Sequence, residues 1–334
     1  MSSIDLSICI LLYNQPEDAK RLLHNLTPQL QEGVEIIIKD DSDNTYTRDI
    51  LEKYSSFKQI KYIHGEKRGI DKTIIFLTEK AQGKFIWWMG DDEVMPNAVN
   101  SILHVIRNER DVNFIWANYN YKSDNHTSLA IDLKEDRFFY DRNELLNCAT
   151  TGLGFISSTI FKRNLALQHI DESKQYVGTE FVNLFLIMTV ITQPGGLYYL
   201  KGPIVICHPA SSDEIKGKTV KQNGEIVNNG FQVFGINFYL IVDRFSKSFA
   251  PSCTRRVIKR TFGMAWRGVL VGWAGGWDTP KGKRIKLIRY FYKFPEVWIA
   301  VILFSMPSFL NSLMYKIYRS IKYRKTKTNL IDKA

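Results

Sequence analysis

The sequence predicts an α/β fold in which a mostly parallel central sheet is flanked by helices, followed by a helical, basic C-terminal extension. In its first half, apolar runs of strand length alternate with segments of helical periodicity, the order that builds an open parallel sheet. The formal net charge of +11 is unevenly spread, because residues 253–334 hold 18 Lys and Arg against three acids, whereas residues 1–252 hold 27 bases and 31 acids. A mildly acidic body is therefore followed by a strongly basic end.

Five apolar runs are predicted to be strands. Continuous apolar runs without polar alternation suit strands that are buried on both faces of a parallel sheet. These runs are residues 6–12, 34–38, 60–63, 85–89 and 112–117.

Helices are expected between these strands. Pro16 suits a first helical turn and is followed by apolar residues at helical spacing. Further helices are expected around residues 50–54, over residues 70–81 and from Pro96 onward. No segment matches the glycine-rich dinucleotide motif or the P-loop motif, which disfavours the first kind of nucleotide site and excludes the second.

Cysteines and targeting signals add little. The four cysteines lie far apart without a CxxC pair, which favours buried thiols in a reducing compartment over a zinc site or a disulfide framework. The first residues lack the basic region of a signal peptide, so no cleaved leader is expected. No apolar stretch reaches the ~20 residues of a membrane-spanning helix.

Acidic residues follow two of the predicted strands, where ligands of such sheets bind. Asp40 and Asp41 follow the second strand, and they can accept hydrogen bonds from a base or a ribose, or cap a helix. Asp91, Asp92 and Glu93 follow the fourth strand. Adjacent carboxylates repel each other, and a divalent cation with phosphate oxygens relieves that cost. This cluster therefore predicts a metal that ties the protein to a diphosphate, with a solvated turn before the next helix as the alternative.

Three segments in this order resemble the family 2 glycosyltransferases, whose nucleotide-sugar-binding fold is called GT-A. They read ICILLYN, EIIIKDDSDN and KRGIDKTIIFLTEKAQGKFIWWMGDDEVMP. Less strongly, TGLG, SSTIFKR, YVGT and GGLYYLKGPIVICH resemble the abequosyltransferase-like branch, which builds O-antigens and other bacterial surface glycans. The resemblance implies a catalytic domain over residues 1–210, with a nucleotide-sugar-binding half at 1–120 and an acceptor half at 121–210. Residues 211–334, the helical C-terminal region, match only in general character.

The resemblance also implies which residues bind the donor and the cofactor, Mn²⁺ or Mg²⁺. Asp92 is expected to be the main metal ligand with Asp91 assisting, although Gly90 shifts these acids relative to the family's motif. His208, after a predicted strand at 204–207, is a further candidate ligand. Lys72 has a solvent-facing helix position as its alternative. The residues expected to bind the nucleotide sugar are Leu12, Tyr13, Asn14, Asp40, Asp41, Arg68, Gly69, Asp71, Lys72 and Asp91.

The general base is expected to be Glu180. Inverting transfer needs a carboxylate that takes a proton from the acceptor hydroxyl, and family members often keep it in an ED-type motif. Glu180 precedes an apolar helix, so its alternative role is to complement the helix N-terminus. Asp171 and Glu172 are the next candidates for the base.

The C-terminal end is predicted to contact a membrane surface. Helices with basic faces are expected at residues 255–270 and 284–293, and residues 297–318 are strongly apolar. The end of this segment and the residues after it, KIYRSIKYRKTK at 316–327, hold six bases in twelve. An apolar, aromatic segment with a basic end is typical of an in-plane interfacial helix, here residues 297–327. A re-entrant or short spanning segment and a core or oligomer-interface helix are the alternatives. No recognition motif accompanies the charge, so no nucleic-acid partner is expected.

Together these features predict a metal-dependent, inverting glycosyltransferase of bacterial polysaccharide, O-antigen or capsule synthesis. Its expected partners are a nucleotide diphosphate sugar, with a UDP-sugar favoured, and a lipid-linked or oligosaccharide acceptor, and a homo-oligomer is left open. The expected location is cytoplasmic, peripheral on the inner face of the plasma membrane. A sugar nucleotidyltransferase is disfavoured because the first strand lacks a glycine-rich basic signature. A non-catalytic glycan-assembly scaffold is disfavoured by the intact acid clusters.

Overall fold

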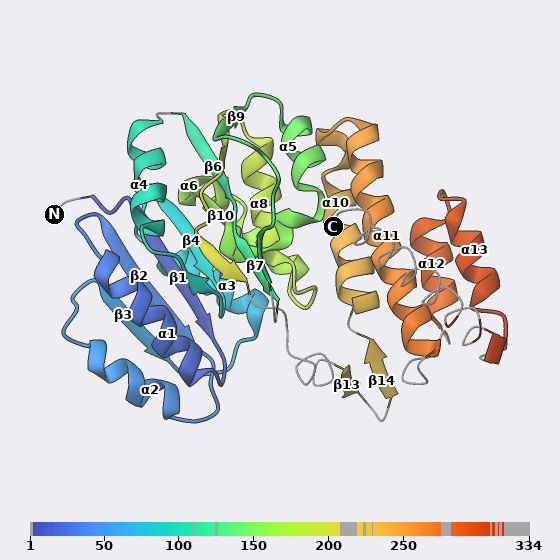
Figure 1. The fold of residues 1–334 in the computed structure, drawn as a ribbon, viewed down its shortest axis with the longest axis horizontal. Helices are drawn as coiled ribbons and strands as arrows, with labels where there is room; N and C mark the ends of the chain where they lie inside the picture. Colours follow the sequence, from blue (N-terminus) through green and yellow to red (C-terminus); the bar gives the residue numbers. More distant parts are fainter. Residues whose placement is uncertain are drawn as a thin grey trace, which may run out of the picture. The chain divides into compact units, whose positions relative to one another are not determined.

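The chain forms two compact units (Figure 1). The computed structural model describes residues 3–109, 111–123, 126–207, 219–222, 225–228, 230–274, 282–307, 309–310, 313 and 316. The first unit comprises residues 1–209 and 244–254, and the second comprises residues 210–243 and 255–334. The catalytic domain predicted from the sequence, residues 1–210, does not include residues 244–254, with which the chain returns to the first unit.

An eight-stranded sheet forms the centre of the first unit, in the order β3-β2-β1-β4-β10-β6-β11-β9. Six strands run in one direction, and β10 and β9 run against their neighbours. The bounds are β1 Leu6–Leu12, β2 Val34–Asp40, β3 Ile60–His64, β4 Phe85–Met89, β6 Val112–Ala117, β9 Arg137–Phe139, β10 Thr159–Lys162 and β11 Gly196–Leu200. The five strands expected from apolar runs are confirmed, and so is the mostly parallel α/β sheet.

Helices cover both faces of this sheet (Figure 1). Leu6, Ile8 and Ile10 of β1 pack into one apolar cluster with residues of α1 and α4, whereas α3 and α8 lie on the opposite face. The α-helices of this unit are α1 Pro16–Leu26, α2 Tyr46–Leu51, α3 Ile70–Lys80, α4 Ala98–Asn108, α5 Arg142–Ala149, α6 Arg163–Leu167, α7 Ile170–Ser173 and α8 Val182–Thr192. Short 3₁₀ helices span Thr27–Gln29, Glu52–Tyr54, Thr150–Gly154, Ile156–Ser158, Lys174–Tyr176 and Ser246–Ser248.

A second, four-stranded sheet fixes the segment that follows β4. Its order is β5-β12-β7-β8, with β5 Glu93–Val94, β12 Val205–Cys207, β7 Asn120–Ser123 and β8 His126–Leu129. Glu93 lies opposite Ile206 in the antiparallel β5–β12 pair. The acidic segment is therefore attached to the acceptor half of the predicted domain rather than forming an isolated turn.

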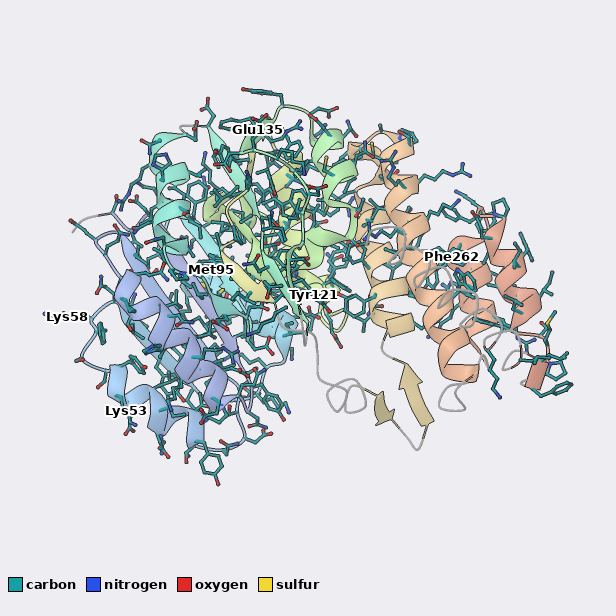
Figure 2. The ribbon with its side chains drawn as sticks, viewed as in Figure 1. Lys53, Lys58, Met95, Tyr121, Glu135 and Phe262 are labelled. Atoms are coloured by element: carbon teal, nitrogen blue, oxygen red, sulfur yellow. The ribbon has the colours of Figure 1, made fainter. Side chains whose placement is uncertain are left out.

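The second unit is largely helical, as predicted, but it also contains a β-hairpin that was not predicted from the sequence. The hairpin strands are β13 Thr219–Gln222 and β14 Glu225–Asn228. A π-helical segment, Gly230–Asn237, leads to α10 Phe238–Arg244, and α11 Pro251–Ala274, α12 Lys283–Phe291 and α13 Glu296–Leu303 follow. The last residue of α10 and the first turn of α11 belong to the first unit. Phe262, labelled in Figure 2, is buried, and its ring centroid lies 5.2 Å from that of Phe291. Within the described residues, no helix has the length and apolar character needed to cross a membrane.

Candidate active site

The acid clusters meet at one edge of the main sheet. Because β2, β1 and β4 are adjacent and parallel, the residues after these strands lie at the same edge. Two contacts link the three strand ends: the Asn14 backbone N–H donates to Ser42 Oγ at 2.8 Å, and Gln15 Nε2 donates to Asp91 Oδ2 at 3.0 Å. The structure thus brings together side chains that are up to 76 positions apart in the sequence.

A cavity of about 270 Å³ lies at the opposite edge of the sheet. It is lined by residues at the amino ends of β2 and β3, among them Val34, Gln59 and Lys58, which Figure 2 labels. Since ligands of such sheets bind beyond the carboxyl ends of the strands, this cavity is not the candidate site.

Asp41 anchors the loop that precedes α3. Its Oδ2 accepts hydrogen bonds from the backbone N–H groups of Arg68 and Gly69 at 2.9 and 3.0 Å, and from Thr73 Oγ1 at 2.9 Å. Its Oδ1 lies 2.6 Å from the buried Lys39 Nζ. Burial opposes ionisation, but these donors outweigh it and hold the pKa of Asp41 below its ordinary value. The residue is therefore an ionised anchor for the predicted phosphate-facing loop.

Asp40 is fully buried and is satisfied by the protein itself. One carboxylate oxygen accepts from the backbone N–H of Ser42 at 2.9 Å and from the Ser42 hydroxyl, and the other accepts from Tyr62 Oη at 2.8 Å. Burial and the nearby Asp40 charge raise the pKa of the Tyr62 phenol. The Asp40 carboxylate thus stabilises the end of β2 through contacts within the protein, and we do not include it in the proposed donor site.

The residues that end β1 lie beside the end of β2. Leu12 is buried, and its carbonyl oxygen accepts from the Asp41 backbone N–H at 2.9 Å. Asn14 has a φ of +54°, a left-handed conformation that asparagine adopts more readily than most residues. Tyr13 is 42% exposed, and Lys67 Nζ lies 3.8 Å from its ring centroid and bonds to its hydroxyl. An aromatic face and a cation are therefore presented together at the strand end.

The predicted loop bases lie next to this aromatic face. Arg68 is exposed and places its guanidinium 4.6 Å from the ring centroid of Phe76. Gly69 has a φ of +73°, and no atom lies within 4 Å of the position a Cβ would take. Lys72 is exposed on α3 and forms no ion pair with any residue that the structure describes. Because Arg68 and Lys72 are exposed, they can contact an anionic ligand without any change in the packing of the hydrophobic core.

The acidic segment after β4 is held from several directions. Asp91 is exposed, and its carbonyl oxygen accepts from Arg21 Nη2 at 2.7 Å. Asp92 is only 7% exposed and accepts from Ser157 Oγ at 2.5 Å. β12 lies beside the acidic segment, since Ile206 pairs with Glu93, and burial and the charges of Asp92 and Asp91 raise the pKa of the Cys207 thiol to about 12. His208 follows Cys207 but lies outside the described residues.

The predicted base candidates differ in their surroundings. Glu180 is exposed, lies just before α8 and has a φ of +64°. Asp171 forms an ion pair with Lys174 at 2.6 Å, and Glu172 forms one with Arg244 at 2.8 Å. Both fallback carboxylates are thus engaged in ion pairs.

Residues 7–166 match the family model described as Glycosyl transferase family 2. This span includes the three strand ends and the loop before α3. The chain carries a family 2 glycosyltransferase domain.

Relatives and solved structures agree with this assignment. The glycosyltransferase is 25% identical over 236 residues to the abequosyltransferase RfbV of Salmonella typhimurium, which covers 64% of this chain and 69% of that protein. It is similar in fold to TarS of S. aureus, residues 1–349, solved with UDP-GlcNAc, with a TM-score of 0.66 and 13% identity over 96% of this chain and 92% of that chain. The same TarS fragment with UDP gives a TM-score of 0.62 over the same shares, at 13% identity. The predicted family and the GT-A fold are confirmed.

The acidic segment of the glycosyltransferase fits a cation that the protein and its substrate hold jointly. Within the described residues, no group of three or more His, Cys, Asp or Glu side chains is placed to hold a metal alone. Mg²⁺ and Mn²⁺ commonly take one or two carboxylates and complete their shell with substrate phosphates and water. Asp92 and Asp91, one buried and one exposed at the same strand end, suit that arrangement.

Several residues of the site escape sequence reasoning. Arg21 and Ser157 contact Asp91 and Asp92 through hydrogen bonds that span 70 and 65 positions of sequence, whereas Lys39 forms an ion pair with Asp41 two positions later. Lys67 is the one with a usable signal, because it is a base directly beside Arg68 in the predicted phosphate-facing loop. Arg21 lies on α1 and Ser157 in a 3₁₀ turn, far in sequence from the acids that they contact.

Proposed function

We propose that this glycosyltransferase moves a sugar from a nucleoside diphosphate sugar to a hydroxyl of a growing bacterial surface glycan, with inversion at the anomeric carbon and with a divalent cation. The observation that carries the proposal is the meeting of three groups at one sheet edge: the Tyr13 and Lys67 face, the loop anchored by Asp41, and Asp92. The nucleobase of the donor needs an aromatic or polar surface, and its diphosphate needs positive charge. The cation bound to that diphosphate needs carboxylates.

The chain's own residues supply most of the transfer step. Arg68 and Lys67 lie where they can offset the charge of the departing diphosphate. Asp92 and Asp91 would hold a divalent cation, which would supply further positive charge to the diphosphate when bound. Glu180 takes the proton from the acceptor hydroxyl, whose oxygen attacks the anomeric carbon as the bond to the diphosphate oxygen breaks. The electron pair of that bond leaves with the nucleoside diphosphate.

A UDP-sugar is the first donor to test. The structures of TarS that resemble this chain contain UDP-GlcNAc and UDP, and the same fold is present here. Differential scanning fluorimetry with each common nucleoside diphosphate and Mn²⁺ tests the proposal, since a ligand that binds the native state at about 100 times its Kd stabilises it by about 2.7 kcal/mol. We expect UDP to raise the Tm most. If no nucleoside diphosphate raises the Tm, the proposed donor site is wrong.

We also propose that the acceptor is lipid-linked and that the second unit binds an anionic membrane surface. On α13, Val297 and Ala300 are buried, whereas Trp298, Ile299 and Ile302 are each more than half exposed. Exposed bases on the preceding helix α12 and just after it are Arg284, Lys286, Arg289 and Lys293. Apolar side chains insert at the lipid interface, and each base near anionic lipid contributes about 1 kcal/mol. The rest of the predicted anchor segment, to residue 327, lies largely outside the described residues.

Replacing Trp298 and Ile302 together by Ser is expected to release the protein from anionic vesicles. Both side chains are exposed, so the fold should persist, while the apolar contact with lipid is lost. Sedimentation with phosphatidylcholine vesicles, with and without phosphatidylglycerol, measures the bound fraction. Tyr140→Ser, at a 94% exposed aromatic of the first unit, is the matched control and should bind like the parent protein. Unchanged binding of the double variant would refute the membrane proposal, and a dimer that dissociates instead would indicate a second copy as the occupant.

A further inference from the structure

Asp71 joins the donor loop to the segment that carries Glu180. It lies in the first turn of α3, is 4% exposed, and turns its carboxylate toward residues 178–182. Its Oδ2 accepts from the backbone N–H groups of Gly178 at 2.7 Å and Glu180 at 2.9 Å, and its Oδ1 accepts from that of Val182 at 3.1 Å. These contacts span 107 to 111 positions of sequence.

Three N–H groups on one buried carboxylate make a strong and specific clamp. Hydrogen bonds to an ionised acceptor are roughly twice as strong as neutral ones, and a buried carboxylate without such donors would be costly. The clamp surrounds Glu180, whose φ of +64° lies in the left-handed region that side chains rarely adopt. Backbone conformations of this kind persist where the surroundings over-determine them. Asp71 supplies that constraint on both sides of Glu180.

The opposite side of the same helical turn is also fixed. Thr73 Oγ1 and the backbone N–H of Gly69 both donate to Asp41 at the end of β2. The start of α3 is therefore held by one carboxylate on the donor side, and it holds the Glu180 segment through another. Glu180 is thereby set in a fixed position relative to the loop that is proposed to bind the diphosphate.

We propose that Asp71 is a positioning residue for the catalytic base, acting through the backbone of residues 178–182 rather than by touching the donor. This inference rests on the proposed function, in which Glu180 removes the acceptor proton. Proton transfer needs the base within hydrogen-bond reach of the hydroxyl, and a displacement of about 1 Å can reduce the rate about 10²-fold. Loss of the clamp should therefore lower kcat and leave donor binding intact.

The test is a double-mutant cycle on kcat with Asp71→Asn and Glu180→Gln. Asp71→Asn keeps the side-chain shape but puts a neutral amide against three N–H donors. We expect kcat to fall about 10- to 100-fold while the donor KM stays within about threefold. In the Glu180→Gln background the same change should alter the residual rate by less than about twofold, because no base is left to position. Asp132→Asn, at an exposed aspartate paired with Lys134, is the control and should leave both constants unchanged.

The outcomes separate this inference from the function on which it rests. If Glu180→Gln retains full transfer, the assignment of the base is wrong and the inference falls with it. If Glu180→Gln abolishes transfer but Asp71→Asn leaves kcat unchanged, or slows both backgrounds equally, only the inference is overturned. A rise in donor KM with kcat unchanged would place Asp71 on the donor instead.

A second variant covers a failure of Asp71→Asn to fold. Gly178→Ala strains a φ of +94° at one of the clamped N–H groups, and no atom lies within 4 Å of the added Cβ. It should lower kcat in the parent and not in the Glu180→Gln background. An equal loss in both backgrounds would contradict the inference.

Discussion

Asp92→Asn is expected to reduce sugar transfer by about 10²- to 10³-fold, the size of effect seen when one group that stabilises developing charge is removed. The carboxylate lies between β4 and β5, is only 7% exposed, and is the acid we propose as the main cation ligand. An asparagine fills the same space and can still accept the hydrogen bond from Ser157, so the strand end should keep its shape. The expected loss therefore comes from the missing charge.

Release of the nucleoside diphosphate, followed over a range of Mn²⁺ concentrations, measures this effect. The variant should need more Mn²⁺ and should stay slow at saturation. Ser157→Ala, which removes the hydrogen bond but leaves the carboxylate, is the informative comparison and should be affected less. Full turnover by Asp92→Asn at saturating Mn²⁺ would mean that the cation is held elsewhere or is not used.

Glu180→Gln is expected to lower kcat by about 10²- to 10⁴-fold, the usual contribution of a general base. The amide is nearly isosteric but cannot take the acceptor proton. The donor is proposed to bind at the strand ends and the loop before α3, so its affinity should not change. Fluorimetry with the donor and single-turnover transfer to the acceptor separate binding from chemistry.

Glu172→Gln is the matched comparison for this prediction. Glu172 lies in the same region, but it forms an ion pair with Arg244 and lies within hydrogen-bond distance of His169 Nδ1. Burial raises the pKa of Glu172, and these two partners outweigh it and hold the pKa below its ordinary value. The Glu172→Gln variant should transfer the sugar nearly as fast as the parent protein. A reversal of the two results, with Glu172→Gln inactive and Glu180→Gln active, would move the base to Glu172.

The main sheet was predictable because five of its strands have a clear local sequence pattern. Residues 6–12 and 85–89 are continuous apolar runs, and such runs are buried on both faces in the structure. The sequence also placed acids after β2 and β4, and parallel strands bring such ends to one edge. The short strands β9 and β10, three and four residues long, carry no comparable signal. Their places in the sheet depend on partners far away in the chain.

The contacts that organise the site were not predictable for a similar reason. Asp71 looks like a donor-side residue from its position beside Gly69, yet its carboxylate is taken up by a segment more than 100 residues later. The sequence gives no reason to assign different roles to the adjacent Asp40 and Asp41. In the structure, Asp40 bonds to Tyr62 in the interior, whereas Asp41 bonds to the loop before α3. Side-chain direction at a strand end depends on the register of neighbouring strands, which periodicity does not specify.

Turnover of the donor identified by fluorimetry tests most directly whether the protein transfers a sugar to a glycan. The protein is incubated with that nucleoside diphosphate sugar, Mn²⁺ and a lipid-linked glycan fraction, and the products are separated. We expect a nucleoside diphosphate and a lengthened glycan in equal amounts, with both lost in Asp92→Asn and in Glu180→Gln. Formation of pyrophosphate from a nucleoside triphosphate and a sugar phosphate, with no lengthened glycan, would rule out sugar transfer and identify a nucleotidyltransferase.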